Sequence, residues 1–373
     1  MRSPLEIPAR SSASSAALLI DMLRHAERTD VDGAHTAVQS RFNDLMDTAA
    51  GHDVLPYIAM RLKRSAKQDC PELLPVLDYI QVQATARNRS LREAAIRVSR
   101  LLAGQDIDAV FLKGAAFIIE DEDSAPWRVT GDLDVLVHPN AMEAAARALM
   151  AAGYQPTRDP KGYTDRLHHH FAPLIDPAEG VVVELHHRLF KDAGIDALRT
   201  EDVFAQAQLL TIGGQAMLIP SPEHRLVHQV LHAQIGNWGH VLRKIGLRDI
   251  VDLAQITSRH RIHTPAIERI LGAANLSRPF SGFIAAGNEI LGREVLQWPL
   301  DRLDESWAKE ARSSLAAPPS QWRQSARIAL HYLRLIVRNP RRLEIAWTVL
   351  RDRQRRGDLV RSNAMRVDAS WHL

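Results

Sequence analysis

Residues 131–137 read GDLDVLV, and this short run decides the fold because it places two aspartates inside an apolar segment that has the composition of a β-strand. Side chains two positions apart on a strand project from the same face, with Cα atoms roughly 6.5 Å apart. Asp132 and Asp134 are therefore expected side by side. Two such carboxylates repel each other and lose hydration, so a bound cation would stabilise them. The alternative is a strand at a sheet edge with both aspartates solvated.

The residues around this strand narrow the choice of cation. Carboxylate ligands on a rigid strand favour Mg²⁺ or Mn²⁺. The chain of 373 residues has a single cysteine, Cys70, which excludes a disulfide framework and a cysteine-based zinc site. A magnesium or manganese site is therefore the simplest interpretation of the aspartate pair.

On either side of GDLDVLV the hydrophobic pattern alternates between strand and helix. The expected strands are IDAVFLKG (107–114), LHHHFAPLID (167–176) and GVVVELHHRL (180–189), with DPAEG (176–180) as a hairpin turn. The expected helices are AAFIIE (115–120) and NAMEAAARALMAAGY (140–154), the second with Asn140 as its N-cap and Gly153 near its C-terminal end. The acidic run EDED (120–123) between them is expected to be a solvated loop.

Helical periodicity dominates the rest of the chain. Residues 12–104 contain several amphipathic stretches, and SPEHRLVHQVLHAQ (221–234) has Ser221 and Pro222 at plausible N-cap and N1 positions. We therefore expect an α+β fold, a small mixed sheet flanked by N-terminal and C-terminal helical regions. The expected segments are an N-terminal helical region (1–104), an α/β core (105–220), a helical domain (221–320) and a basic helical segment (321–373).

The elements LKGAA (112–116) and WRVTGDLDVLV (127–137) resemble those of the uncharacterised bacterial nucleotidyltransferases, a family of the DNA polymerase β-like superfamily. The resemblance covers most of residues 40–255 and implies the fold of that superfamily for the core. It also implies a metal-dependent transfer of an NMP group from an NTP to an acceptor, with release of pyrophosphate.

The resemblance assigns roles to single residues of the first two elements. It implies that Asp132 and Asp134 bind metal, and that Lys113 and Gly114 correspond to the superfamily's glycine element, where backbone N–H groups approach phosphates. Lys113 either contacts a phosphate or pairs with the aspartates. Arg128 either clamps the triphosphate bidentately or forms a salt bridge to the EDED loop.

The third carboxylate of the superfamily is expected in VVVELHHRL (181–189). Alternation places Glu184 and His186 on one face of that strand, so Glu184 is the candidate both for metal binding and for the general base, with His186 beside it. An outward-facing Glu184 would instead leave a protein that binds nucleotide without turning it over.

Histidines and acids elsewhere are also candidates for the site or for its surroundings. His168 and His170 share a face, for which a surface or substrate-groove role is favoured. His224, His228 and His232 lie on one helical face, which could bind zinc or pack on the core beside the nucleotide. In LRDIVDLAQI (247–256), which also resembles the family, Asp249 is a candidate for contact with the core.

The composition and the charge distribution limit the class of protein and its possible binding partners. With 46% hydrophobic and 24% charged residues the chain is an ordinary globular protein, neither disordered nor fibrous. No signal peptide or membrane span is recognised, so a cytoplasmic location is expected. Residues 321–373 hold twelve arginines against four acids. This segment suits a membrane surface, RNA or an acidic protein partner, and the alternative is a pair of closing helices with solvated arginines.

The hypothesis for function is a nucleotidyltransferase that uses an NTP, Mg²⁺ or Mn²⁺, and a hydroxyl acceptor on a small molecule or a protein. Nucleic acid is a less favoured acceptor because the core segment has no basic or aromatic excess. The alternative is a catalytically inactive nucleotide-binding or scaffold protein with the same fold.

Overall fold

A mixed β-sheet lies at one side of the computed structural model, which describes residues 10–24, 41–121, 123, 125–159, 169–190, 197–317 and 319–338. Seven strands in these ranges form the sheet, in the order β3-β4-β5-β2-β1-β7-β6. The strands are β1 (Ala109–Phe111), β2 (Leu133–Val137), β3 (Gln155–Pro156), β4 (Leu174–Ile175), β5 (Val182–His186), β6 (Gln208–Ile212) and β7 (Gln215–Ile219). Two neighbouring pairs, β2 with β5 and β1 with β7, are parallel, and the other pairs are antiparallel.

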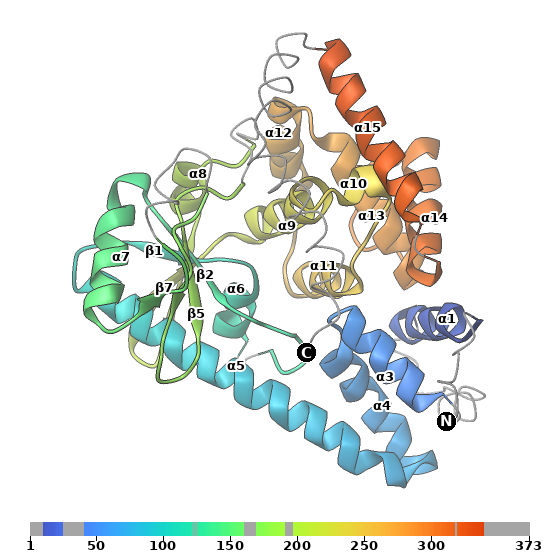
Figure 1. Cartoon of the computed structure of the whole chain (residues 1–373), viewed down its shortest axis with the longest axis horizontal. Coiled ribbons are helices and arrows are strands. Elements are labelled where there is room, and N and C mark those ends of the chain that lie inside the picture. The colour runs from blue at the N-terminus through green and yellow to red at the C-terminus, as the bar shows by residue number, and fades with distance from the viewer. Residues whose placement is uncertain are drawn as a thin grey trace, which may run out of the picture.

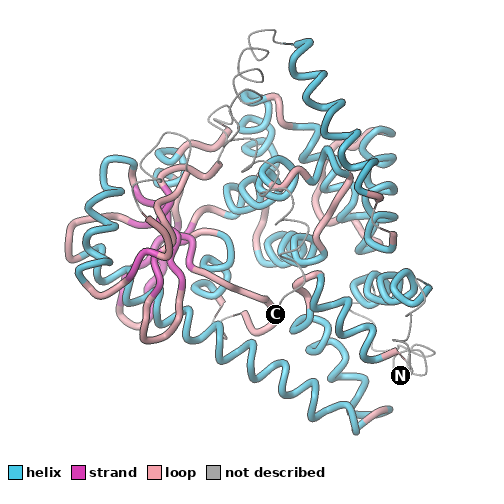
Figure 2. Tube along the Cα trace, in the orientation of Figure 1, coloured by secondary structure: helices cyan, strands magenta, loops and turns pink. Residues whose placement is uncertain are grey.

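Helices precede, interrupt and follow the sheet, which confirms the expected α+β class (Figures 1 and 2). Before it come α1 (Arg10–Arg24), α3 (Phe42–Gly51), α4 (Leu55–Asp69), the 3-10 turn η1 (Pro71–Leu73) and α5 (Leu74–Ala103). Between the strands lie α6 (Lys113–Glu120), the 3-10 turn η2 (Pro139–Ala141), α7 (Met142–Ala151) and α8 (Thr200–Ala205). After it come α9 (Pro222–Leu231), the π-helical turn η4 (His232–Gly236), α10 (Gly239–Leu242), α11 (Leu247–Arg259), α12 (Thr264–Ala274), α13 (Ser277–Leu291), α14 (Arg302–Ala316) and α15 (Gln321–Arg338).

Local sequence signals explain how several elements begin and end. The Ser221 hydroxyl accepts a hydrogen bond from the His224 N–H at 3.3 Å, and Pro222 is the first residue of α9, as expected. Asn140 is not the N-cap of α7, because Pro139 already starts a 3-10 turn that leads into the helix at Met142. Gly153 follows the end of α7 with a φ of +101°, which confirms the expected C-terminal position.

Two hairpins widen the sheet at its edges. In the expected turn DPAEG, Asp176 donates a backbone hydrogen bond to Val181 and accepts one from Gly180, both at 2.8 Å, so β4 and β5 pair antiparallel. The hairpin of β6 and β7 was not expected. Its turn is Gly213-Gly214, with φ of +56° and +73°, and a glycine pair between two apolar-rich runs is the signal that could have revealed it.

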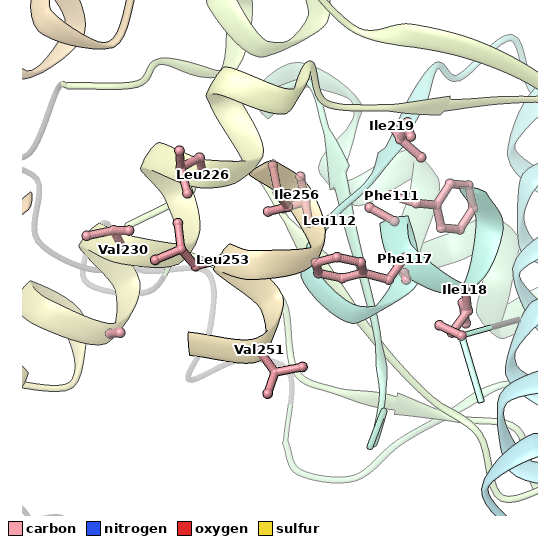
Figure 3. Close-up of a cluster of buried hydrophobic side chains, with 14 of the residues drawn as sticks. Phe111, Leu112, Phe117, Ile118, Ile219, Leu226, Val230, Val251, Leu253 and Ile256 are labelled. Atoms are coloured by element: carbon pink, nitrogen blue, oxygen red, sulfur yellow. The ribbon is translucent and has the colours of Figure 1, made fainter. Parts of the chain in front are cut away.

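The helices after the sheet pack directly on its core. Figure 1 shows α7 on the outer side of the sheet, and α6, α9 and α11 on the side that faces the later helices. Buried apolar side chains continue from the sheet into these helices without a break. Figure 3 shows part of this cluster, with Phe111, Leu112, Phe117, Ile118 and Ile219 next to Leu226, Val230, Val251, Leu253 and Ile256. Since α9 and α11 share a core with the sheet, they are held in place over one of its faces.

The basic C-terminal segment is described only as far as Arg338, the end of α15. The expectations for residues 339–373 lie outside the described residues. Among those that are described, no helix is both long enough and apolar enough to cross a lipid bilayer.

Candidate active site

The two strands that carry the acidic residues lie side by side. β2 and β5 pair in parallel, with Asp134 opposite Glu184 and Leu136 opposite His186. The expectation that Glu184 comes from a neighbouring strand is therefore confirmed. The edge-strand alternative is wrong, because β2 lies between β1 and β5. Strand alternation brings Asp134, Glu184 and His186 to one face of the sheet.

Asp134, Glu184 and His186 form a group that could hold a metal ion. Each offers one ligand atom, and these atoms all lie within 4.8 Å of one another. The His186 Nε2 atom is 2.8 Å from Asp134 Oδ1 and 3.6 Å from Glu184 Oε2. Asp134 and His186 are buried, whereas the Glu184 side chain is 25% exposed, so Glu184 is the member of the group that solvent reaches.

Asp132 lies beside this group, in the residue before β2 begins, and is less buried than Asp134. It was expected among the metal ligands, but across the described residues it is not part of the group that could hold an ion. Burial raises the pKa of Asp132 to about 6, and the negative charges of Asp134 and Glu184 add to this effect. Such an effect requires the three carboxylates to be close together.

Lys113 supplies a positive charge to the site from the start of α6. Its backbone is left-handed, with a φ of +45°, which is uncommon for a residue with a side chain. Its Nζ atom donates a hydrogen bond to Asp134 Oδ1 at 2.6 Å, so of the two expected roles the structure shows the pairing with an aspartate. Burial alone would lower the pKa of Lys113, but the charge of Asp134 outweighs it and the pKa is raised.

Asp134 is the most strongly stabilised anion of the site. Burial on its own would raise the pKa of its carboxyl group, but Lys113 and His186 outweigh burial and hold this pKa well below its usual value. Asp134 is therefore charged at neutral pH, with two hydrogen-bond donors on the same oxygen.

Gly114 has a packing role that was not anticipated. A Cβ atom at this position would lie 2.5 Å from Arg128 Nη1 and 2.7 Å from Thr130 Cγ2. Contacts this short do not occur between real side chains, so the missing Cβ is what allows the Arg128 guanidinium to pass over the first turn of α6.

Arg128 joins the sheet to α11. Its Nε and Nη2 atoms donate to the two carboxylate oxygens of Asp252, at 3.0 and 2.9 Å, and Nη1 donates to Thr130 Oγ1 and to the Val129 carbonyl oxygen. Both charged side chains of the pair are buried. Of the two expected roles of Arg128, the salt bridge to the EDED loop is wrong, because its acidic partner is Asp252 on α11. The clamping of a triphosphate stays a prediction.

Asp252 could have been identified from the sequence by its neighbours. It stands between Val251 and Leu253, in a helix whose apolar residues recur at helical spacing, so a charge there lies among core positions. Asp252 makes the contact with Arg128, while the carbonyl oxygen of Asp249 accepts a hydrogen bond from Gln229 Nε2 at 2.8 Å.

Several histidines surround the carboxylates. The rings of His169, His170 and His186 lie within 5.5 Å of one another by their centroids, and the His228 and His232 rings are 6.3 Å apart. Burial, and after it Lys113, lowers the pKa of His228 to about 3 and that of His232 well below its usual value. His228 in α9 and His232 at the start of η4 therefore pack on the core as neutral side chains near Lys113. His168 lies outside the described residues.

The EDED run is not a solvated loop at its start. Glu120 accepts a hydrogen bond from Arg225 Nη1 at 2.7 Å and lies 3.0 Å from His260 Nε2, while Asp121 pairs with Arg259 at 2.6 Å. Both acidic side chains are mostly buried, at 15% and 12% exposure. The expectation is wrong for these two residues, because the helices after the sheet cover them with basic side chains.

Comparisons with known proteins identify the family of the chain. The family model of the uncharacterised nucleotidyltransferases matches residues 39–292, well over half of the chain. Among solved structures, the chain is similar to an antigenic nucleotidyltransferase-like protein from Paracoccidioides brasiliensis, at 19% identity and a TM-score of 0.33. That match covers 51% of this chain and 91% of the other, and at this TM-score it supports no structural argument. A comparison with curated proteins gave no match.

Proposed function

We propose that this chain, which belongs to the uncharacterised nucleotidyltransferase family, is a metal-dependent enzyme that moves an NMP group from an NTP to a hydroxyl acceptor. The observation that carries the proposal is the parallel pairing of β2 with β5, which sets Asp134 opposite Glu184. We also infer membership of the DNA polymerase β-like superfamily, whose division of labour among carboxylates this arrangement resembles.

The residues present suit a divalent ion. Asp134 and Glu184 supply the oxygen donors that Mg²⁺ and Mn²⁺ prefer, and His186 adds a nitrogen within the same 4.8 Å group. His186 also has a buried Nδ1 atom without a hydrogen-bond partner in the described part of the chain, so this ring can form one more polar contact. We assign Asp134, Glu184 and His186 as the ligands, with Asp132 as a further carboxylate beside them. When bound, the ion would neutralise charge on the phosphates and on the attacking oxygen.

In the proposed reaction, the acceptor oxygen bonds to the α-phosphorus of the NTP. The bond from that phosphorus to the oxygen bridging to the β-phosphate breaks, and pyrophosphate leaves with the bonding electrons. Glu184, the member of the group that solvent reaches, would take the proton of the acceptor hydroxyl. Lys113, whose Nζ atom lies 2.6 Å from Asp134 Oδ1, would offset the negative charge of the carboxylates. Its ammonium group would turn toward the phosphates when nucleotide binds.

Calorimetric titration with NTPs, with and without Mg²⁺ or Mn²⁺, tests this proposal. Wild type should bind an NTP in a metal-dependent way, and Asp134→Asn should weaken that binding by at least about tenfold, since it removes a charged ligand. Asp202→Asn, which changes an exposed aspartate in α8, is the matched control and should leave binding unchanged. Wild type that binds no NTP in the presence of either ion would refute the enzyme hypothesis.

Pyrophosphate release against a panel of small-molecule and protein hydroxyl acceptors then tests catalysis. Glu184→Gln should abolish release even at metal and NTP concentrations that saturate the variant, because the proton acceptor is needed in the chemical step. Release at the wild-type rate under saturating conditions would contradict the role of Glu184 as a base.

The second candidate is a catalytically inactive nucleotide-binding protein. The observation in its favour is that Lys113 and His186 both donate to Asp134, so the chain itself compensates this carboxylate. This candidate predicts NTP binding that needs no metal and that survives Asp134→Asn, together with no pyrophosphate release from any acceptor.

A further inference from the structure

The pairing with Asp252 takes up two of the N–H donors of Arg128, the arginine that was expected to hold the triphosphate of the proposed reaction. Two other arginines lie near the segment that leads into β2. Arg87 on α5 donates to the carbonyl oxygen of Gly131, and Arg248 on α11 is one helical turn from Asp252, the partner of Arg128. We propose that Arg87 and Arg248 form the anion-binding clamp for the polyphosphate of the nucleotide. This inference rests on the proposed function and specifies how that site takes its substrate.

Arg87 reaches the site from the middle of the long helix α5. Its Nη2 atom donates to the carbonyl oxygen of Gly131 at 2.8 Å, in the residue directly before Asp132. The neighbouring residue Asn88 is buried and donates to the carbonyl oxygens of Ala125 and Arg128, so α5 holds the whole segment that leads into β2. The guanidinium of Arg87 has several N–H donors, and one bond to a carbonyl leaves others to meet an anion.

Arg248 reaches the site from the first turn of α11. It precedes Asp252 by four residues, so the two side chains lie on one face of the helix, about 6 Å apart. Asp252 holds Arg128 over Gly114, at the start of α6. Arg248 is therefore one helical turn away from the contact that joins α11 to the start of α6.

The surroundings of Arg248 are acidic, and its side chain remains accessible. Its Nη1 atom pairs with Asp53 Oδ2 at 3.1 Å, and its side chain is 39% exposed. Its Nε atom is buried and makes no hydrogen bond with any described residue. Burial alone would lower the pKa of Arg248, but Asp249 and other acids, Asp132 among them, outweigh it and raise this pKa.

A polyphosphate suits this arrangement better than a single phosphate group does. Two guanidinium groups from separate helices can contact separate phosphates of one chain, and planar guanidinium groups bind phosphate oxygens bidentately. The carboxylates beside them would repel a bare anion, so the clamp favours a polyphosphate that carries a divalent cation.

The test is titration with ATP, AMP and inorganic tripolyphosphate in the presence of Mg²⁺, on wild type, Arg87→Gln and Arg248→Gln. Each variant should bind ATP and tripolyphosphate roughly 10- to 100-fold more weakly, since a charged hydrogen bond is lost, while AMP binding changes by less than about threefold. Tripolyphosphate has no base, so its result does not depend on which nucleotide the protein prefers.

Arg259→Gln is the matched control for Arg248→Gln. Arg259 lies in the last turn of the same helix, about 16 Å away, pairs with Asp121, and is 35% exposed. The Arg259→Gln variant should bind all three probes as tightly as wild type does. Arg248→Lys should show an intermediate loss of affinity for tripolyphosphate, since lysine keeps the charge but not the planar guanidinium. If Arg248→Gln does not fold, Arg248→Lys replaces it in the test.

The outcomes separate this inference from the proposed function. Wild type that binds neither ATP nor tripolyphosphate would overturn both. Wild type that binds ATP, with unchanged ATP affinity in either arginine variant, would overturn the clamp alone. An equal loss for AMP and ATP would also overturn it, because the arginines would then act through the general shape of the site.

Discussion

Replacing Asp252 by Asn should destabilise the protein far more than the same change in a surface ion pair. Asp252 accepts two hydrogen bonds from Arg128, at 3.0 and 2.9 Å, and the side chains are only 2% and 8% exposed. The variant Asp252→Asn keeps the shape of the side chain but leaves the guanidinium as a buried charge without a counter-ion. The substitution would therefore weaken the contact that joins the sheet to α11.

The expected magnitude follows from this burial. Removing one partner of a buried ion pair costs about 3 to 5 kcal/mol. With an unfolding entropy of roughly 2.1 cal/mol/K for each residue, a chain of 373 residues has about 0.8 kcal/mol/K in total, so the melting temperature should fall by about 4 to 6 °C.

Thermal unfolding followed by circular dichroism measures this shift, and the chain offers a matched control. Arg199 and Asp202 form the same two-bond geometry, at 2.9 and 3.0 Å, but are 61% and 42% exposed. Asp202→Asn should lower the melting temperature by no more than about 1 °C, because exposed pairs contribute about 0 to 1 kcal/mol. Equal shifts in the two variants would refute the reasoning.

A double variant separates the unpaired charge from the lost contact. Arg128→Met with Asp252→Leu removes both charges, and it should be less destabilised than Asp252→Asn alone, since apolar pairs of similar size often replace buried ion pairs without loss. A double variant that is less stable than the single one would show that the hydrogen bonds, rather than the unpaired charge, carry the effect.

Three further predictions concern the site. Gly114→Ala should destabilise the protein by about 1 to 3 kcal/mol in urea denaturation, because its Cβ would overlap Arg128, whereas Gly131→Ala, whose Cβ meets nothing within 4 Å, should change stability by under about 1 kcal/mol. His228, whose pKa burial lowers to about 3, stays neutral in the folded chain but is protonated below pH 6.5 in the unfolded chain, so stability falls as the pH falls. Between pH 7.5 and 5.5, His228→Gln should therefore lose about 1.4 kcal/mol less stability than wild type, and equal losses would contradict this. Glu184→Gln should weaken Mn²⁺ binding, measured by paramagnetic relaxation of water, by at least about tenfold, and unchanged affinity would remove Glu184 from the metal group.

Local regularities of the chain made part of the site predictable. Alternation along a strand places Asp132 near Asp134 and Glu184 near His186, since it depends only on backbone geometry. The Ser221 cap and the DPAEG turn follow from the hydrogen bonds that neighbouring residues make with one another.

Contacts between distant parts of the chain were not predictable in this way. The partner of Arg128 is 124 positions away, and Lys113 at the start of α6 reaches an aspartate 21 positions away on β2. Nothing in the local sequence indicated that Gly114 makes room for a guanidinium. Each of these contacts depends on how α6, β2 and α11 pack.

The sequence by itself determined which acids share a face, where the main helices and strands lie, and which family the motifs resemble, because these properties depend on neighbouring residues. Only the tertiary structure decided that β2 lies next to β5 with Asp134 opposite Glu184, that Lys113 compensates Asp134, and that Arg128 pairs with Asp252 on α11. Strand order and buried ion pairs are set by the packing of the whole core, in which a charge must find a counter-ion wherever the fold places one.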